Sequence, residues 1–268
     1  MNSDCSDLRF SDSDDSTQLP YWIESGCDTA ETKVWVKVPL IESQTSIYMY
    51  YGNPSAVSES NASAVFDFFD DFNGDSIDES KWVIDDSTGF SVSGGMLIGT
   101  NTYGRLYSVQ SFSGPLIAEA RQNITSFAPN GHEVIGFYSG GYGFGGFLPH
   151  SNDNFYTFIN NGFYGYNPSA NVTVSNNWCI YKILDDGQGY SYEIIEQEGT
   201  SNTHTKQYSY SINSLPIAIG KRYDGWGGQS YYAYWDWIRV RKYTGNNLTF
   251  EIGSEESGGT MRKGLVST

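Results

Sequence analysis

Hydrophobic and polar residues alternate along the N-terminal part of the chain. In residues 33–38 three valines alternate with Lys, Trp and Lys, and in residues 47–51 Ile, Met and Tyr alternate with two further tyrosines. Alternation with a period of two is typical of strands with one buried face. The turn residues 52–54, Gly-Asn-Pro, end the run. The pattern therefore predicts a small β module over residues 1–54.

The pattern changes after this module. Residues 55–65 are small and polar and predict a linker. Over residues 66–253, short apolar runs alternate with Gly, Asn and Asp turn signals at the spacing of a β-sandwich. In residues 238–241 the apolar Ile and Val face one way and two Arg the other, as in a closing strand. Residues 254–268 show no pattern, and we expect them to be disordered.

Composition and charge narrow the possible partners. Aromatic residues make up 16% of the chain and charged residues only 17%, which favours strands over helices. The net charge of −16 argues against nucleic acid and anionic membranes, because binding phosphates requires clustered Lys and Arg. An acidic surface is compatible with neutral sugars, with divalent cations or with solubility alone. No run approaches the roughly 20 apolar residues of a membrane helix, so we expect no membrane insertion.

Four Asn-X-Ser/Thr sequons favour an exported protein. Separately, Cys5 and Cys27 flank a predicted hairpin and could form a disulfide. Cys179 lies in an apolar run and is expected to be a buried free thiol. The N-terminus lacks the features of a signal peptide, so we expect that this signal has been removed or lies upstream. The sequons are at Asn61, Asn123, Asn171 and Asn247.

Three stretches resemble a known domain family. Residues 7–14, 19–25 and 47–54 are similar to an uncharacterised domain of archaeal and bacterial surface proteins. That family commonly precedes a laminin G-like, concanavalin A-like domain, which residues 69–82 and 235–243 resemble at its two edges. The resemblance implies an all-β chain with a small β-sandwich module followed by a concanavalin A-like (laminin G-like) jelly-roll sandwich.

The same resemblance has consequences for location and assembly. It implies an extracellular or cell-surface protein of the sugar-binding or adhesive kind. Relatives have further strands upstream of residue 7, so the first module is expected to be incomplete at its N-terminus. An open strand edge favours self-assembly by strand addition.

Aromatic residues are densest in residues 136–166 and again in residues 223–234. Flat rings can stack on the apolar C–H faces of sugars while nearby polar groups hold the hydroxyls. The alternative is that these rings pack in the core or form cross-strand ladders. If the sheet is curved, we expect both groups to lie on adjacent strands or loops. The predicted glycan-binding residues are Tyr138, Tyr142, Phe144, Tyr164, Tyr166, Trp226 and Tyr232.

A structural Ca²⁺ is also expected from the resemblance. Asp70 and Asp71 follow the first predicted strand of the sandwich and Asp236 lies on its last one, and these strands are neighbours in the fold. Carboxylates and backbone carbonyls are the ligands that Ca²⁺ prefers. The alternative is that Asp70 and Asp71 only end the strand and cap a turn.

The sequence contains no convincing catalytic pair. Glycosidases of the related fold carry two Glu and an Asp on one strand, facing one cleft. In residues 193–198, Glu196 and Glu198 share a face, Glu193 lies on the opposite one, and the Asp is missing.

We therefore predict a non-catalytic extracellular protein that binds a polysaccharide or cell-surface glycan on aromatic side chains of the second domain. Two alternatives are kept. One is a structural subunit of a surface fibre or coat, assembled by β-strand addition. The other is a glycoside hydrolase or polysaccharide lyase.

Overall fold

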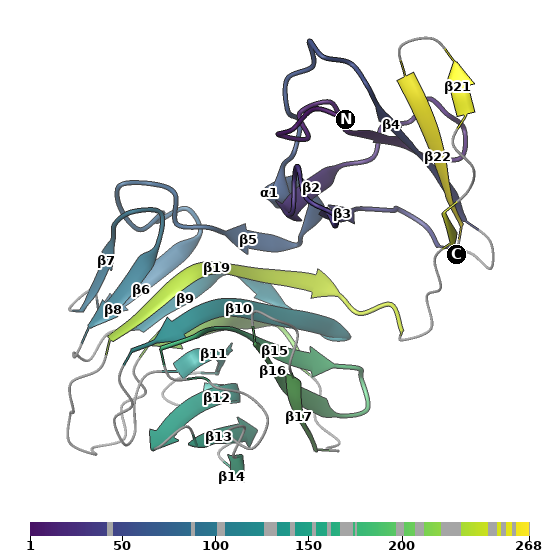
Figure 1. Cartoon of the computed structure of the whole chain (residues 1–268). Coiled ribbons are helices and arrows are strands. Elements are labelled where there is room, and N and C mark those ends of the chain that lie inside the picture. The colour runs from purple at the N-terminus through teal and green to yellow at the C-terminus, as the bar shows by residue number, and fades with distance from the viewer. Residues whose placement is uncertain are drawn as a thin grey trace. The chain divides into compact units, whose positions relative to one another are not determined.

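The computed structural model divides the chain into two compact units (Figure 1). Unit 1 consists of Met1–Asp67 and Gly245–Thr268, and unit 2 of Phe68–Thr244. No described helix is long and apolar enough to cross a membrane. The structure describes residues 1–41, 45–86, 89–100, 105–125, 133–139, 143–151, 154–159, 162–166, 174, 176–196, 201–206, 212–220, 232–245, 251–252, 256–258 and 261–267.

Unit 1 is built from two small sheets. The larger has the strand order β1-β4-β22-β20, with β21 also paired to β22, and the smaller pairs β2 with β3. Its core contains Phe10, Leu19, Tyr21 and Ile47, with the valines of β3 packed against them. The strands are β1 (Arg9–Ser11), β2 (Tyr21–Ser25), β3 (Lys33–Val36), β4 (Ser46–Tyr51), β20 (Glu251–Ile252), β21 (Glu256–Gly258) and β22 (Met261–Ser267).

The C-terminal tail is part of this unit. The expectation that residues 254–268 are disordered is wrong, because β21 and β22 lie within them. β22 pairs with β4 from Arg262 opposite Tyr51 to Ser267 opposite Ser46. Such pairing joins backbone groups and does not require a hydrophobic pattern. Side-chain patterning therefore missed this strand.

Residues 55–65 are not a free linker. The Ser60 hydroxyl accepts a hydrogen bond from the Ile23 amide at 2.9 Å, and the Asn61 amide donates to the Tyr21 carbonyl at 2.8 Å. The Asn61 side chain then caps the short helix α1 (Ala62–Val65) by accepting from the Ala64 amide. These bonds join the segment to β2 and correct the predicted linker.

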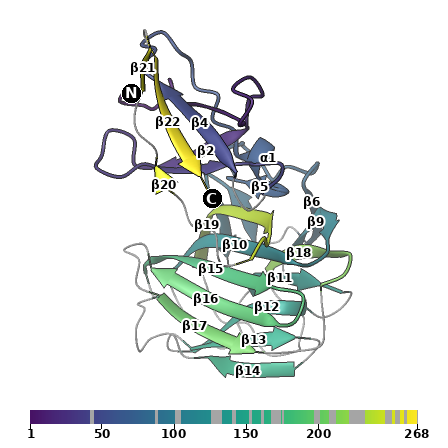
Figure 2. The ribbon, with the colours of Figure 1, turned by 90° about the vertical axis from the view of Figure 1, so that its right-hand side faces the viewer.

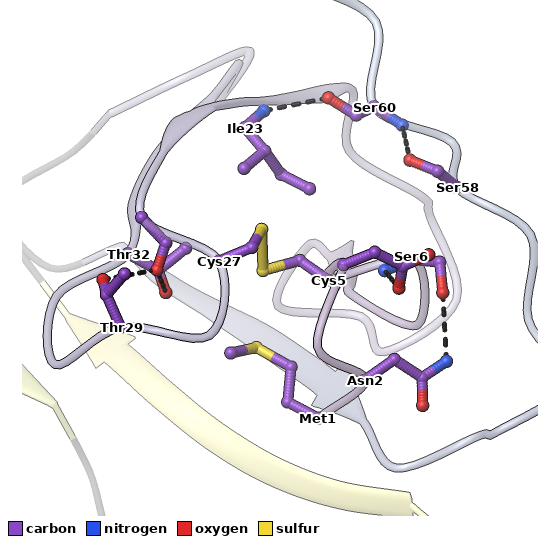
Figure 3. The surroundings of a disulfide bond; sticks show 12 residues. Met1, Asn2, Cys5, Ser6, Ile23, Cys27, Thr29, Thr32, Ser58 and Ser60 are labelled. Carbon is purple, nitrogen blue, oxygen red and sulfur yellow. Dashed lines mark hydrogen bonds between the residues drawn. A yellow bond between two sulfur atoms is a disulfide. The ribbon is translucent and has the colours of Figure 1, made fainter.

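The predicted disulfide between Cys5 and Cys27 is confirmed (Figure 3). Cys5 is fully buried in the core of unit 1. The two cysteines are 22 residues apart, and closing a loop of that size contributes about 3 kcal/mol by restricting the unfolded chain. Cys179 is buried and free, as predicted.

Unit 2 is a sandwich of two sheets (Figures 1 and 2), which confirms the all-β jelly-roll fold class. The eight-stranded sheet has the order β17-β16-β15-β10-β19-β8-β7, with β5 also paired to β19. The seven-stranded sheet has the order β14-β13-β12-β11-β18-β9-β6. The first sheet consists of β5 (Phe68–Asp70), β7 (Phe90–Val92), β8 (Leu97–Thr100), β10 (Leu116–Ile124), β15 (Trp178–Asp185), β16 (Tyr190–Glu196), β17 (Ser201–Lys206) and β19 (Tyr232–Lys242). The second consists of β6 (Trp82–Asp86), β9 (Arg105–Phe112), β11 (Glu133–Tyr138), β12 (Gly143–Ser151), β13 (Asn154–Ile159), β14 (Gly162–Tyr166) and β18 (Leu215–Gly220).

A row of alternating charges crosses the centre of the eight-stranded sheet. Ala118 and Ala120 point into the core, so Glu119 between them lies on the opposite face of β10. Glu119 stands opposite Arg239 of β19 and Lys182 of β15. Its carboxylate accepts a hydrogen bond from Arg239 Nε at 2.7 Å. The row continues with an ion pair between Lys182 and Glu193 at 3.0 Å.

Glu119 is also close to a second guanidinium group. The Nε atom of Arg241 lies 3.3 Å from the same carboxylate. Only 4% of Glu119 and 1% of Arg239 are exposed, so the pair is buried. Burial alone would raise the pKa of Glu119, but Arg239 and Arg241 outweigh it and lower the pKa from 4.5 to about 2. The ionised form of Glu119 is thus favoured by folding.

We expect Glu119→Gln to lower the free energy of unfolding of unit 2 by about 3 kcal/mol, because it leaves a buried guanidinium group without its counter-charge. The folded-state pKa lies below the unfolded one, so the contribution is complete above the unfolded value of 4.5 and is lost as the pH falls toward about 2. Urea unfolding at several pH values should therefore show the difference between variant and wild type shrinking over that range.

Glu193→Gln is the matched control. It breaks an ion pair in the same row whose side chains are 25% and 22% exposed, so we expect a loss of less than about 1 kcal/mol. Equal losses for the two variants would contradict the account.

Candidate functional site

The outward face of the seven-stranded sheet is the candidate site. Along β9, β18, β11 and β12, alternate side chains enter the core. The residues between them must face the other way, because side chains alternate along a strand. The outward set on neighbouring strands is Tyr107, Ala218, Gly136 and Gly146, and the inward set is Leu106, Ile217, Ile219, Ile135, Phe137 and Phe147.

The pairing register places this outward set in one row. Tyr107 is opposite Ala218, Ala218 is opposite Gly136, and Gly136 is opposite Gly146. We call Ala218, Gly136 and Gly146 the small-residue row. A Cβ atom on Gly146 would lie only 2.5 Å from the carbonyl oxygen of Ile135, so β11 and β12 could not keep their spacing around a larger residue. Three adjacent strands therefore carry at most a methyl group beside Tyr107.

Two tyrosines and an arginine form a cluster beside this row. The rings of Tyr107 and Tyr138 stack with centroids 5.1 Å apart and an angle of 30° between their planes. Their strands are separated by β18, and the small side chain of Ala218 leaves room for the rings to meet. The Arg105 guanidinium lies 4.7 Å from the centre of the Tyr138 ring. We call Arg105, Tyr107 and Tyr138 the aromatic cluster.

The chemistry of the aromatic cluster is that of a platform for an apolar or amphipathic ligand. Both tyrosines are half-buried, so part of each side chain is exposed to solvent. Arg105 is 6% exposed, so its role is to hold the Tyr138 ring by a cation–π contact. A ring fixed by two neighbours loses little conformational entropy when a ligand stacks on it.

The sequence analysis found one member of this cluster, Tyr138. Phe144 lies on β12, and Tyr164 and Tyr166 lie on β14, all strands of the same sheet. The structure describes the backbone of these three residues but not their side chains. Two further predicted residues, Tyr142 and Trp226, lie outside the described residues altogether.

Tyr232 is on the other sheet, so the expectation that both aromatic groups share one surface is wrong for this residue. It lies on β19, opposite Thr100 of β8, in the eight-stranded sheet. Its neighbour Ala233 points into the core, and Tyr232 itself is 47% exposed. It therefore points away from the seven-stranded sheet. The sequence could not show this, because both sheets contain strands of the same alternating pattern.

Arg105 and Tyr107 were missed by the sequence analysis. The signal that could have found them is the alternation of residues 105–108, in which the core residue Leu106 separates the two. Their proximity to Tyr138 is not visible in the sequence, because β9 and β11 are joined through β18.

The three aspartates of the predicted calcium site are separately engaged. Asp70 is buried and accepts hydrogen bonds from Trp82 Nε1 at 2.6 Å and from Lys81 Nζ at 3.1 Å. Asp71 accepts from the Asn73 side chain at 2.6 Å, and Asp236 pairs with an arginine, Arg121. β5 and β19 are neighbours, as predicted. Among the described residues, no three acidic, His or Cys side chains are grouped to hold a metal. Calcium binding remains a prediction.

Replacing Asp70 and Asp71 in turn separates the two roles. We expect Asp70→Asn to lower the free energy of unfolding by about 1–3 kcal/mol, because donors lie on both carboxylate oxygens of Asp70 and an Asn amide offers only one acceptor. Asp71→Asn, which affects one exposed contact, should change it little. Thermal unfolding with EDTA and with added CaCl₂ checks this. A loss shared by both variants and seen only with calcium would instead support the metal site.

Of the three glutamates considered for catalysis, the structure describes the side chain of one. Glu193 is engaged by Lys182 in the row of charges described above. Glu196 ends β16, but its side chain is not described, and Glu198 lies outside the described residues. Each described carboxylate of the eight-stranded sheet forms an ion pair with a basic side chain or accepts a hydrogen bond from an indole or a backbone amide. They are Asp70, Glu119, Asp185, Glu193 and Asp236.

Comparison with known families assigns part of the chain. Residues 4–85 match a family described as a domain of unknown function, DUF2341. The match covers unit 1 up to Asp67 and continues through β5 into β6. An uncharacterised domain in the first part of the chain is therefore shown, as the motifs suggested. No curated protein matches the sequence.

Unit 2 is similar to solved structures. One of these structures was described in work on the endo-acting O-glycanases that members of the human gut microbiota use to initiate mucin breakdown. Its sequence is 14% identical, and the match has a TM-score of 0.51 and covers 67% of this chain and 100% of that one. A pseudo β-1,3-glucanase and immunostimulatory antigen of Mycobacterium tuberculosis is 14% identical, with a TM-score of 0.49 over 66% and 99%. A lichenase from a mouse hindgut metagenome is also 14% identical, with a TM-score of 0.48 over 66% and 99%. The similarity to the first of these structures supports the jelly-roll fold and nothing about function.

Proposed function

We propose that unit 2 is a non-catalytic carbohydrate-binding domain that holds a glycan against the outward face of its seven-stranded sheet. The observation that carries the proposal is the stacked pair Tyr107 and Tyr138 beside the small-residue row. Tyrosine rings offer a flat apolar surface to the C–H face of a sugar, and their hydroxyl groups reach its polar edge. The small-residue row is itself buried, with Ala218 0% exposed, so the sugar would rest on the exposed parts of the two rings.

Other classes of ligand fit this surface less well. A chain with 31 acidic and 15 basic residues is a poor partner for nucleic acid. Neutral or weakly charged glycans carry no such penalty. The non-catalytic part of the proposal rests on the sequence, because a glycosidase requires two carboxylates facing the bond that it breaks and the Asp between Glu196 and Glu198 is missing.

The features of unit 1 support a location outside the cell. The disulfide between Cys5 and Cys27 is of the kind that persists in oxidising compartments. We therefore propose that the chain is an extracellular or cell-surface protein of the adhesive kind, with a laminin G-like sandwich that contacts a polysaccharide or surface glycan. Unit 1 would then connect that sandwich to its surroundings.

We expect Tyr107→Ala to weaken glycan binding by about 5-fold to 150-fold, since losing one stacked ring typically costs about 1–3 kcal/mol, judged from bases stacked on aromatic residues. Tyr232→Ala is the matched control. It removes an exposed tyrosine from the other sheet of the same unit and should leave the affinity unchanged. A glycan array selects the ligand, and calorimetry on the best binder gives the dissociation constants.

Two outcomes would count against the proposal. One is an array without a single reproducible ligand for the folded wild type. The other is a loss of affinity for Tyr232→Ala that equals the loss for Tyr107→Ala, while circular dichroism shows both variants folded.

A further inference from the structure

Unit 1 takes its larger sheet from both ends of the chain. β1 and β4 come from the first 67 residues, whereas β20, β21 and β22 come from the last 24, Gly245–Thr268. Between them, unit 2 folds around a hydrophobic core of its own. The sheet is therefore completed only when the C-terminal segment returns to β4 (Figure 1).

β22 is the main partner of β4. β1 pairs with only three residues of β4, Tyr48–Tyr50, while β22 pairs with all six, Ser46–Tyr51. Without β22, the backbone N–H and C=O groups along one edge of β4 would have no strand to pair with. Such an edge is a template for another strand.

The C-terminal segment carries its own internal pairing. β21 pairs with Met261–Lys263 of β22, and β20 pairs with Val266–Ser267. The three strands can therefore exchange as one small sheet, in which the backbone bonds between β22 and β4 would pass from one chain to another. A terminal element that is attached in this way is suited to exchange between copies at little cost.

We propose that β4 of one chain accepts β22 of a second copy, so that the protein associates by strand exchange. The backbone bonds and the register are those of the single chain, because both copies have the same sequence. This self-association is independent of glycan binding by unit 2.

Cysteine cross-linking tests the exchange in the full-length protein. Tyr48 is directly opposite Leu265, and Tyr50 is directly opposite Lys263. Opposed residues of antiparallel strands have Cβ atoms about 4.5–5.5 Å apart, within reach of a disulfide after mild oxidation with diamide. We expect a mixture of Tyr48→Cys chains and Leu265→Cys chains to give a covalent dimer, because neither variant can form this bond alone. Tyr50→Cys mixed with Lys263→Cys should do the same.

The mismatched mixtures are the control. In the mixture of Tyr48→Cys and Lys263→Cys chains, the two cysteines are out of register by two residues. We expect at least about fivefold less covalent dimer, since diagonal positions exceed the distance that a disulfide spans. The double variant Tyr48→Cys/Leu265→Cys shows whether β22 pairs with β4 in solution at all.

Three results would overturn the proposal. The first is a disulfide that forms within single chains of the double variant, while the matched mixtures give no covalent dimer even at high protein concentration. The second is the absence of any bond in the double variant. The third does not depend on the cysteine variants: light scattering that finds the wild type strictly monomeric at every concentration tested.

Discussion

The packing of alternate side chains into the core of unit 2 decides what its seven-stranded sheet carries on the outward face. Because Phe137, Phe147 and Ile217 fill the space between the sheets, their neighbours Gly136, Gly146 and Ala218 must face outward. A one-residue slip of any of these strands would exchange the two sets. The contact between the two tyrosines therefore depends on the same register that buries the core.

Charge has a different role in each unit. In unit 2, opposite charges join the central strands of the eight-stranded sheet, and the buried Glu119 keeps its carboxylate ionised for two arginines. In unit 1, acidic residues exceed basic ones by eleven to three over residues 1–67, and β22 completes the larger sheet by backbone pairing with β4. If that strand is exchanged between chains, each assembly carries more than one glycan-binding surface, and linked sites bind a multivalent glycan far more tightly than single ones.

The sequence was sufficient for features that depend on local pattern. Alternation predicted the all-β fold, hairpin spacing predicted the bond between Cys5 and Cys27, and both are confirmed. It was insufficient where distant segments meet. β22 has no hydrophobic pattern and is held by backbone pairing, and the layer to which Tyr232 belongs depends on the partner strands of β19. The predicted calcium ligands illustrate the same limit, since Asp70 already has an indole and an ammonium partner that the sequence did not show.

The central claim is that a glycan rests on the outward face of the seven-stranded sheet. It is tested most directly by NMR, with backbone amide signals of unit 2 followed while the best glycan from an array is added. The account predicts that the shifts gather on β9, β11 and β18, around Tyr107, Tyr138 and Ala218, and leave β8 and β19 unchanged. Shifts confined to the eight-stranded sheet would contradict it.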